Sequence, residues 1–352
     1  MDLDALEADA RSGLTRLAYD YYAGGADDEL TLADNVAAWQ RLRLRPRVLR
    51  DVSTVDISTT VLGAPVRMPV LVAPTAYQRL AHEEGERANA RGTAAAGSLL
   101  IVSTLATVSL EDVAAAAPQA PRWMQIYLQK DKAINAELVA RAAAAGYRAL
   151  VLTVDLPVAG YRRRDERNGF TLPPGMTMAN FGTRHPDLPH GGSGLAAHVV
   201  QELAANVTAA DVEWLAGQSA MPVLVKGVLR GDDAADCVRA GAAGVVVSNH
   251  GGRQLDGAIA TADALPEVLD AVGGDVEVYV DGGVRRGTDV VKALAMGARA
   301  VLIGRPAIWG LATGGAGGVQ AVLDGFGEEL ERAMRLCGAR TVAELTPDLL
   351  AR

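Results

Sequence analysis

The chain has 352 residues and carries 34 Lys and Arg against 42 Asp and Glu, which gives a formal net charge of −8 with His neutral. This acidic balance argues against nucleic-acid binding, because such binding needs a surplus of Lys and Arg facing phosphates. Apolar residues make up 49% and charged residues 22%, values typical of a globular protein rather than a disordered chain. The length fits either two average domains or one large α/β barrel.

The cysteine content and the distribution of apolar residues indicate the compartment in which the protein works. Two cysteines, Cys237 and Cys337, are too few for a disulfide framework or a zinc site, so we expect a reducing, cytoplasmic environment. The first residues lack a basic segment followed by an apolar run, and no stretch approaches the roughly 18–20 apolar residues of a membrane span. We therefore expect no secretory signal and no membrane partner. His82 and Glu83 begin an HExxH-like pattern, but residue 86 is Glu instead of His, so we expect no metal site.

The organisation along the chain predicts one domain. Residues 1–65 are polar and mixed in character, which indicates an N-terminal extension that is mainly helical. From residue 66 onward, aliphatic runs alternate with Ala-rich segments that favour helix. The runs are 68–73, 99–102, 123–128, 149–154, 223–225, 244–247, 276–280 and 300–303. Eight strand–helix units indicate a closed (β/α)8 barrel, a TIM barrel, over residues 66–310, and residues 311–352 are expected to form C-terminal helices.

The structural alternative to a barrel is an open, doubly wound sheet. Nearly every aliphatic run ends in polar residues or glycine, as at 153–155, 248–250 and 281–283. In a barrel these ends converge on one face, where barrel active sites are built, whereas an open sheet spreads them along a line. The density of polar residues at the run ends favours a barrel with its site on that face.

A long interval separates the fourth and fifth runs. It exceeds a normal crossover by roughly 40 residues, and long loops in compact domains are usually functional lids or disordered inserts. We expect residues 160–215 to form a lid over the site, with a disordered insert as the alternative.

Two glycine-containing segments late in the chain have the character of a phosphate site. Asp281, Gly283 and Arg285 follow the seventh run, and Gly304 and Arg305 follow the eighth. Glycine lets the backbone approach an anion closely, and a helix N-terminus presents N–H groups to it. The loops after strands seven and eight are the usual phosphate position in barrels. Ordinary turns with surface arginines are the alternative; the chain lacks the Walker and early GxGxxG patterns of nucleotide sites.

The stretch 248–256, Ser-Asn-His-Gly-Gly-Arg-Gln-Leu-Asp, is the most distinctive in the chain. His250 stands at a predicted strand end, and a His is the natural general base near neutral pH. Arg253 follows two glycines and is suited to hold a carboxylate through two parallel hydrogen bonds. The pattern therefore predicts acid–base chemistry on a carboxylate-bearing substrate.

This stretch and residues 281–289, Asp-Gly-Gly-Val-Arg-Arg-Gly-Thr-Asp, resemble the FMN-dependent 2-hydroxy acid oxidases and dehydrogenases, such as glycolate oxidase, lactate oxidase, mandelate dehydrogenase and hydroxymandelate oxidase. With further matches at 19–22 and 73–76, the resemblance covers roughly residues 10–345. It implies FMN as cofactor, a 2-hydroxy acid oxidised to the 2-oxo acid, and a homotetramer. An FMN barrel acting on a phosphorylated substrate and a non-catalytic flavin-binding protein are the alternatives.

Carried over position by position, the resemblance assigns roles to the predicted strand ends. The residues implied to hold FMN are Pro74, Thr75, Ala76, Ser103, Gln125, Thr153, Lys226, Ser248, Asp281, Gly283, Arg285, Gly304 and Arg305. The residues implied to bind the substrate carboxylate are Tyr21, Tyr127, Arg162 and Arg253. His250 is implied to take a proton while Asp155 orients its ring and stabilises the imidazolium. The flavin N5 is implied to accept the hydrogen and its electrons, as hydride or through a carbanion.

Two departures from the family pattern bear on the substrate. Leu105 stands where plant glycolate oxidase has a tryptophan, so we expect room for a 2-hydroxy acid larger than glycolate, aromatic or branched or medium-chain aliphatic. Tyr161 stands where several relatives carry Arg, so Arg162 is preferred among residues 162–164 with the register open by one position. For the electron acceptor we favour dioxygen, which yields hydrogen peroxide. A quinone or other acceptor, and a lactate oxidase-like activity, are the alternatives.

Overall fold

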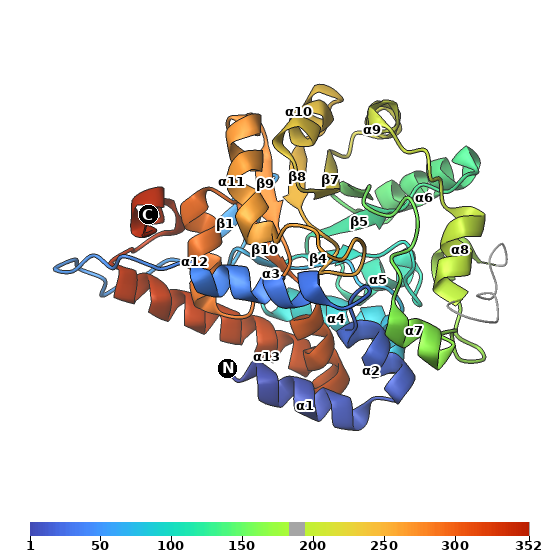
Figure 1. Ribbon diagram of the computed structural model, residues 1–352, viewed down its shortest axis with the longest axis horizontal. Helices are drawn as coiled ribbons and strands as arrows, with labels where there is room; N and C mark the ends of the chain where they lie inside the picture. Colours follow the sequence, from blue (N-terminus) through green and yellow to red (C-terminus); the bar gives the residue numbers. More distant parts are fainter. Residues whose placement is uncertain (183–193, 352) are drawn as a thin grey trace.

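The computed structural model describes residues 1–182 and 194–351. Helices α1 (Leu3–Gly13), α2 (Arg16–Ala23) and α3 (Leu30–Arg41) precede the barrel. Side-chain caps set the starts of the first two, because the Asp2 carboxylate accepts from the backbone N–H groups of residues 4 and 5, and the Thr15 hydroxyl accepts from that of residue 18. In this extension, α2 and α3 lie against the barrel mouth (Figure 1).

Eight parallel strands close into a barrel in the order β10-β3-β4-β5-β6-β7-β8-β9. They are β3 (Val70–Val72), β4 (Leu100–Val102), β5 (Arg122–Ile126), β6 (Leu150–Thr153), β7 (Val223–Val228), β8 (Gly244–Val247), β9 (Glu277–Val280) and β10 (Ala300–Ile303). Val301 of β10 pairs with Val280 of β9 and with Val70 of β3, which closes the ring. Each strand overlaps one of the eight aliphatic runs, so the predicted TIM barrel is confirmed.

Helices cover the outside of the barrel (Figure 1). They are α4 (Gly85–Ala95), α5 (Leu110–Ala116), α6 (Lys132–Ala144), α9 (Ala209–Ala216), α10 (Gly231–Arg239), α11 (Thr261–Val272), α12 (Gly287–Met296) and α13 (Arg305–Cys337). α13 is kinked at Gly314 and Gly315, where the backbone leaves helical geometry. Within the described ranges, none of the helices has the length and apolar character needed to cross a bilayer.

The barrel interior is filled by side chains at the end opposite the site. Trp123 and Tyr279 meet edge to face inside it, with ring centroids 5.5 Å apart. A hairpin of β1 (Thr59–Val61) and β2 (Ala64–Val66) packs onto this cluster. The backbone N–H of Leu62 in its turn donates to the Glu277 carboxylate of β9 at 2.9 Å. Because the N-terminal end is closed by packing, ligands are expected at the C-terminal face.

The predicted lid lies between β6 and β7. Part of it, residues 183–193, is outside the described residues. The described part includes α7 (Arg163–Asn168) and α8 (Gly194–Glu202), and α7 lies beside α2 at the barrel mouth (Figure 1).

Candidate active site

The C-terminal ends of the strands surround a cavity that opens to solvent. Most of the residues predicted from sequence line it: Tyr21, Pro74, Thr75, Ala76, Ser103, Leu105, Tyr127, Thr153, Arg162, Lys226, His250, Arg253, Asp281, Gly283, Arg285, Gly304 and Arg305. Gln125, Asp155 and Ser248 lie behind the wall and bond to residues that line it.

His250 follows β8 and is held between two polar partners. Its Nδ1 lies 2.9 Å from the Asp155 Oδ1, and its Nε2 lies 3.3 Å from the Tyr127 hydroxyl. The backbone N–H of His250 also donates to the Ser248 hydroxyl at 3.1 Å, which helps hold a left-handed backbone with φ of 59°. Because a carboxylate only accepts, Nδ1 carries the proton and Nε2 accepts from Tyr127 at the cavity wall. The ring is therefore oriented to act as a base through Nε2.

The charges of this pair follow from burial and proximity. Burial lowers the pKa of His250, while the adjacent Asp155 carboxylate opposes that change. Burial alone would raise the pKa of Asp155, but His250 and then Lys226 lower it overall. Burial raises the pKa of Tyr127, so its hydroxyl keeps its proton. At neutral pH the site therefore holds a neutral imidazole, an ionised carboxylate and a phenol that can donate.

Two neighbours position Asp155. The Gln254 side-chain amide donates to the Asp155 backbone carbonyl at 2.8 Å. Gly227 in β7 has φ of 108°, and a Cβ there would lie 2.6 Å from the Cβ of Asp155. Only glycine adopts this backbone and leaves the carboxylate its space. Gln254 was not singled out from sequence, although it belongs to the distinctive stretch 248–256.

Arg253 is held by the C-terminal end of α2. Its Nη1 donates to the backbone carbonyls of Tyr21 at 2.6 Å and Gly24 at 2.9 Å, and its guanidinium carbon lies 4.9 Å from the centre of the Tyr21 ring. The carbonyl end of a helix carries partial negative charge that favours a cation. Arg162, which is 7% exposed, donates from Nε to the Arg253 carbonyl at 3.3 Å. The two guanidinium groups thus enter the cavity wall together, as a carboxylate site requires.

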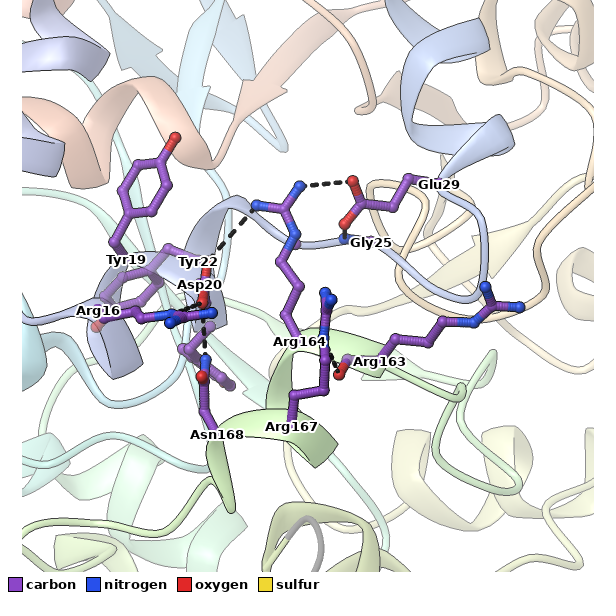
Figure 2. A network of polar contacts seen from close by, with 12 residues as sticks. Arg16, Tyr19, Asp20, Tyr22, Gly25, Glu29, Arg163, Arg164, Arg167 and Asn168 are labelled. Atoms are coloured by element: carbon purple, nitrogen blue, oxygen red, sulfur yellow. Dashed lines mark hydrogen bonds and ion pairs between the residues drawn. The ribbon is translucent and has the colours of Figure 1, made fainter.

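The structure also distinguishes the three consecutive arginines. Arg163 is exposed, and Arg164 turns away from the cavity to pair with Glu29 at 2.6 Å and Asp20 at 3.7 Å (Figure 2). Of the three, Arg162 is the one that lines the cavity. The register preferred from sequence therefore agrees with the geometry.

Lys226 and Asp281 form a buried ion pair at the base of the cavity. The Lys226 ammonium lies 3.0 Å from the Asp281 Oδ2 and donates to the Ser248 hydroxyl at 2.7 Å. Burial alone would lower the pKa of Lys226, but Asp281 and Asp155 raise it overall. The second oxygen of Asp281, Oδ1, is buried and has no hydrogen-bond partner among the described residues. A donor such as a ribityl hydroxyl would satisfy this oxygen, so the residues present fit FMN.

Gln125 lies behind the cavity wall and bonds to residues at the ends of the strands on either side of it. Its side-chain amide donates to the Thr153 hydroxyl at 3.2 Å, and its carbonyl oxygen accepts from the Ser103 hydroxyl at 3.3 Å and the Thr104 N–H at 3.0 Å. In this structure Gln125 therefore fixes two residues of the cavity wall from behind.

The predicted phosphate end combines a tight backbone with buried cations. A Cβ on Gly283, whose φ is 77°, would lie 2.1 Å from the Asn35 carbonyl of α3, so only glycine fits. Arg305 donates to the carbonyls of Tyr22, Gly24 and Gly251 at 2.9 to 3.0 Å. Burial, with the nearby Arg253 and Arg285, lowers the pKa of Arg305 well below its ordinary value. Neighbouring buried guanidinium groups favour an anion, which a phosphate supplies.

An apolar wall completes the cavity. It includes Leu105, which is 3% exposed, and three residues that the sequence analysis did not name, Leu156, Ala159 and Val199. Aliphatic residues in loops carry no distinctive signal, which is why they were missed. No cluster of His, Cys, Asp or Glu in the described part of the chain could hold a metal ion.

Known proteins resemble this chain in sequence and in fold. The model of the FMN-dependent dehydrogenase family matches residues 10–352. The chain is 51% identical to L-lactate oxidase of Nostoc sp. over 97% of this chain and 95% of the relative. It is 48% identical to 2-hydroxyacid oxidase 1 of Homo sapiens over 98% and 95%. The crystal structure of mandelate oxidase with (S)-4-hydroxymandelic acid is 44% identical, with a TM-score of 0.93 over 99% of this chain and 98% of that one.

Proposed function

The chain belongs to the FMN-dependent dehydrogenase family, and from this premise we propose that it oxidises an L-2-hydroxy acid to the 2-oxo acid, with dioxygen reduced to hydrogen peroxide. FMN is the cofactor. One observation carries the proposal: the Asp155-backed imidazole of His250, with Nδ1 and Oδ1 2.9 Å apart, shares a cavity with the guanidinium pair of Arg162 and Arg253. A base beside a carboxylate site is the arrangement that oxidation next to a carboxylate needs.

We propose that different side chains bind the substrate carboxylate and accept the substrate proton. Arg162 and Arg253 bind the substrate carboxylate, with the hydroxyls of Tyr21 and Tyr127 as further donors. His250 then takes a proton from the substrate through Nε2, and the Asp155 carboxylate stabilises the imidazolium as it forms. When bound, FMN supplies the two-electron acceptor that amino-acid side chains lack.

Lys226 supplies fixed positive charge on the cofactor side. Its ammonium is buried, and Asp281 and Ser248 hold it in place. A preorganised cation in a water-poor site stabilises negative charge that develops nearby during reaction. We propose that Lys226 would lie beside bound FMN and supply this positive charge there.

For the substrate we propose a 2-hydroxy acid larger than glycolate, mandelate-like or branched or medium-chain aliphatic. The support is an apolar part of the cavity wall. It is formed by aliphatic side chains, Leu105, Leu156, Ala159 and Val199, and we propose that the substrate's own side chain packs against it. L-Lactate is a second candidate, because a 51% identical relative is named L-lactate oxidase. A homotetramer in the cytoplasm is proposed on the family resemblance, and light scattering tests the oligomer.

Anaerobic mixing tests the reaction class. The FMN-loaded enzyme is mixed with glycolate, L-lactate, (S)-mandelate and L-2-hydroxyoctanoate, and bleaching of the flavin absorbance is followed. We expect bleaching, with the highest kcat/KM for one of the two larger acids, and no fast bleaching in a His250→Gln variant. Failure to bleach with every acid would refute the reaction class, and a preference for glycolate would refute the substrate size.

Admission of oxygen then tests the acceptor. We expect one hydrogen peroxide for each 2-oxo acid formed. A much lower ratio, with turnover restored by a soluble quinone, would replace dioxygen by another acceptor.

A further inference from the structure

A buried acid that the proposed chemistry does not use lies beside the carboxylate site. Asp165 in α7 is 2% exposed, and its Oδ2 lies 3.9 Å from Nη1 of Arg162. That distance is an ion pair but too long for a hydrogen bond. Oδ2 has no hydrogen-bond partner among the described residues. Leaving a buried carboxylate oxygen without such a partner is unfavourable, so its presence beside the site needs a reason.

Contacts on another face of α7 hold Asp165 where it is. Arg164 pairs with Glu29 and with Asp20 of α2, and the Asn168 side-chain amide donates to the same Asp20 carboxylate at 2.8 Å (Figure 2). These contacts join α7 to α2 and leave Asp165 turned inward. Its position is therefore determined by the docking of the helix.

The surroundings of Asp165 are cationic. Burial raises its pKa, and the guanidinium groups of Arg253 and then Arg162 oppose that rise. Burial in turn lowers the pKa of Arg253, with Arg162 adding to the fall, while Tyr21 and Asp165 oppose it. The hydrogen bonds of Arg253 go to neutral backbone carbonyls. Asp165 thus brings a carboxylate to a pair of buried cations, whose positive charge favours its ionised form.

We propose that Asp165 is a positioning residue that sets the net charge of the carboxylate site. The two guanidinium groups of Arg162 and Arg253 and the ionised carboxylate of Asp165 together carry a single excess positive charge, which one substrate carboxylate neutralises. A dicarboxylate would leave an uncompensated negative charge beside the apolar wall, which is unfavourable. Asp165 therefore makes the site selective for 2-hydroxy monocarboxylates; this inference rests on the proposed function.

The gap of 3.9 Å fits this role. A direct bidentate pair would occupy the donors of Arg162 and compete with the substrate carboxylate. At 3.9 Å the charge of Asp165 still acts on Arg162, because Coulomb attraction falls slowly with distance. Arg162 uses Nε on the Arg253 carbonyl, which leaves its Nη groups to the ligand.

The test compares Asp165→Asn with Glu166→Gln in the FMN-loaded enzyme. Both variants remove one carboxylate from adjacent residues of α7, but Asp165 is buried beside the arginine pair and Glu166 is partly exposed. The probes are propionate and succinate, which carry one and two carboxylates and have no 2-hydroxyl to oxidise. Two quantities are measured for each anion: its inhibition constant in competition with the 2-hydroxy acid that the enzyme oxidises, and the rise in Tm that it produces.

We expect Asp165→Asn to strengthen succinate binding relative to propionate by roughly tenfold. The reason is that the variant removes a negative charge that repels the second carboxylate of succinate. Asp165→Glu, which restores the charge, should return the ratio to the wild-type value, and Glu166→Gln should leave it unchanged. The KM of Asp165→Asn for a malate-like dicarboxylate should fall, with a smaller change in kcat. A purely structural role would weaken both anions alike.

An unchanged succinate-to-propionate ratio in Asp165→Asn, or an equal change in Glu166→Gln, would overturn the proposal. If Asp165→Asn does not accumulate as folded protein, Asp165→Ser is measured in its place against the same criteria. The Tm readout needs no turnover, so it stays informative if no 2-hydroxy acid bleaches the flavin. A flavin that no 2-hydroxy acid bleaches would refute the proposed function, whereas the Tm comparison would still test the charge of the anion site.

Discussion

Replacing Asp155 by Asn is the sharpest test of the acid–base pair. The change removes a negative charge while keeping the shape of the side chain. Asp155 Oδ1 accepts from His250 Nδ1 at 2.9 Å, and the backbone of Asp155 stays anchored by Gln254. The variant therefore alters the electrostatics of His250 with little reason for the surrounding loop to move.

The size of the effect follows from Coulomb attraction. An imidazolium and a carboxylate whose charges are about 4 Å apart attract by about 4 kcal/mol at an effective dielectric constant of about 20. The attraction grows as His250 gains its proton, so its loss raises the barrier and lowers kcat roughly a thousandfold. The KM should change little, because the substrate carboxylate is proposed to bind to Arg162 and Arg253, which the substitution leaves in place.

The pH dependence of kcat/KM gives a second, independent test of the interaction between His250 and Asp155. Burial lowers the pKa of His250 and Asp155 opposes this, so the acid limb of kcat/KM lies below the ordinary His value of about 6.5 and moves to lower pH in Asp155→Asn. Since the folded protein disfavours the imidazolium, the free energy of unfolding also falls as the pH drops below about 6.5.

Anaerobic stopped-flow reduction of the flavin across the pH range measures both effects. Asp28→Asn, which removes an exposed carboxylate, is the control and should behave as the wild type. A reduction rate within tenfold of the wild type, or an acid limb that moves to higher pH, would refute the reasoning.

Three further changes test other parts of the site. Leu105→Trp narrows the apolar wall, so the kcat/KM ratio of glycolate to mandelate should rise more than about tenfold; an unchanged ratio contradicts the assignment. Gly227→Ala places a Cβ 2.6 Å from that of Asp155, which should lower kcat about tenfold or more and destabilise the fold by about 1–3 kcal/mol, seen as a lower Tm. Arg285→Met should weaken FMN binding by roughly tenfold or more in a fluorescence titration while leaving riboflavin binding unchanged, because riboflavin lacks the phosphate; equal losses for both ligands would disagree.

Much of the fold could be predicted because its signals are local. Aliphatic runs of strand length, separated by helix-favouring segments, predict parallel strands wherever they occur, and their polar ends predict the face of the site. The His250–Arg253 stretch and the glycines near Asp281 are likewise short motifs whose spacing is visible in the chain. These features predicted the barrel and the face of the site, and the family resemblance that the motifs carry implied FMN and pointed to His250 as the base, without any knowledge of long-range contacts.

The tertiary structure decided what depends on segments distant in the chain. The docking of α7 on α2 directs Arg162 inward and Arg164 outward, and it buries Asp165 beside the arginine pair. The carbonyls at the end of α2 receive the donors of Arg253 and Arg305, although the sequence analysis assigned those arginines to ligands alone. Composition could count these charges, but their effect depends on burial and distance, which exist only once the segments have packed together.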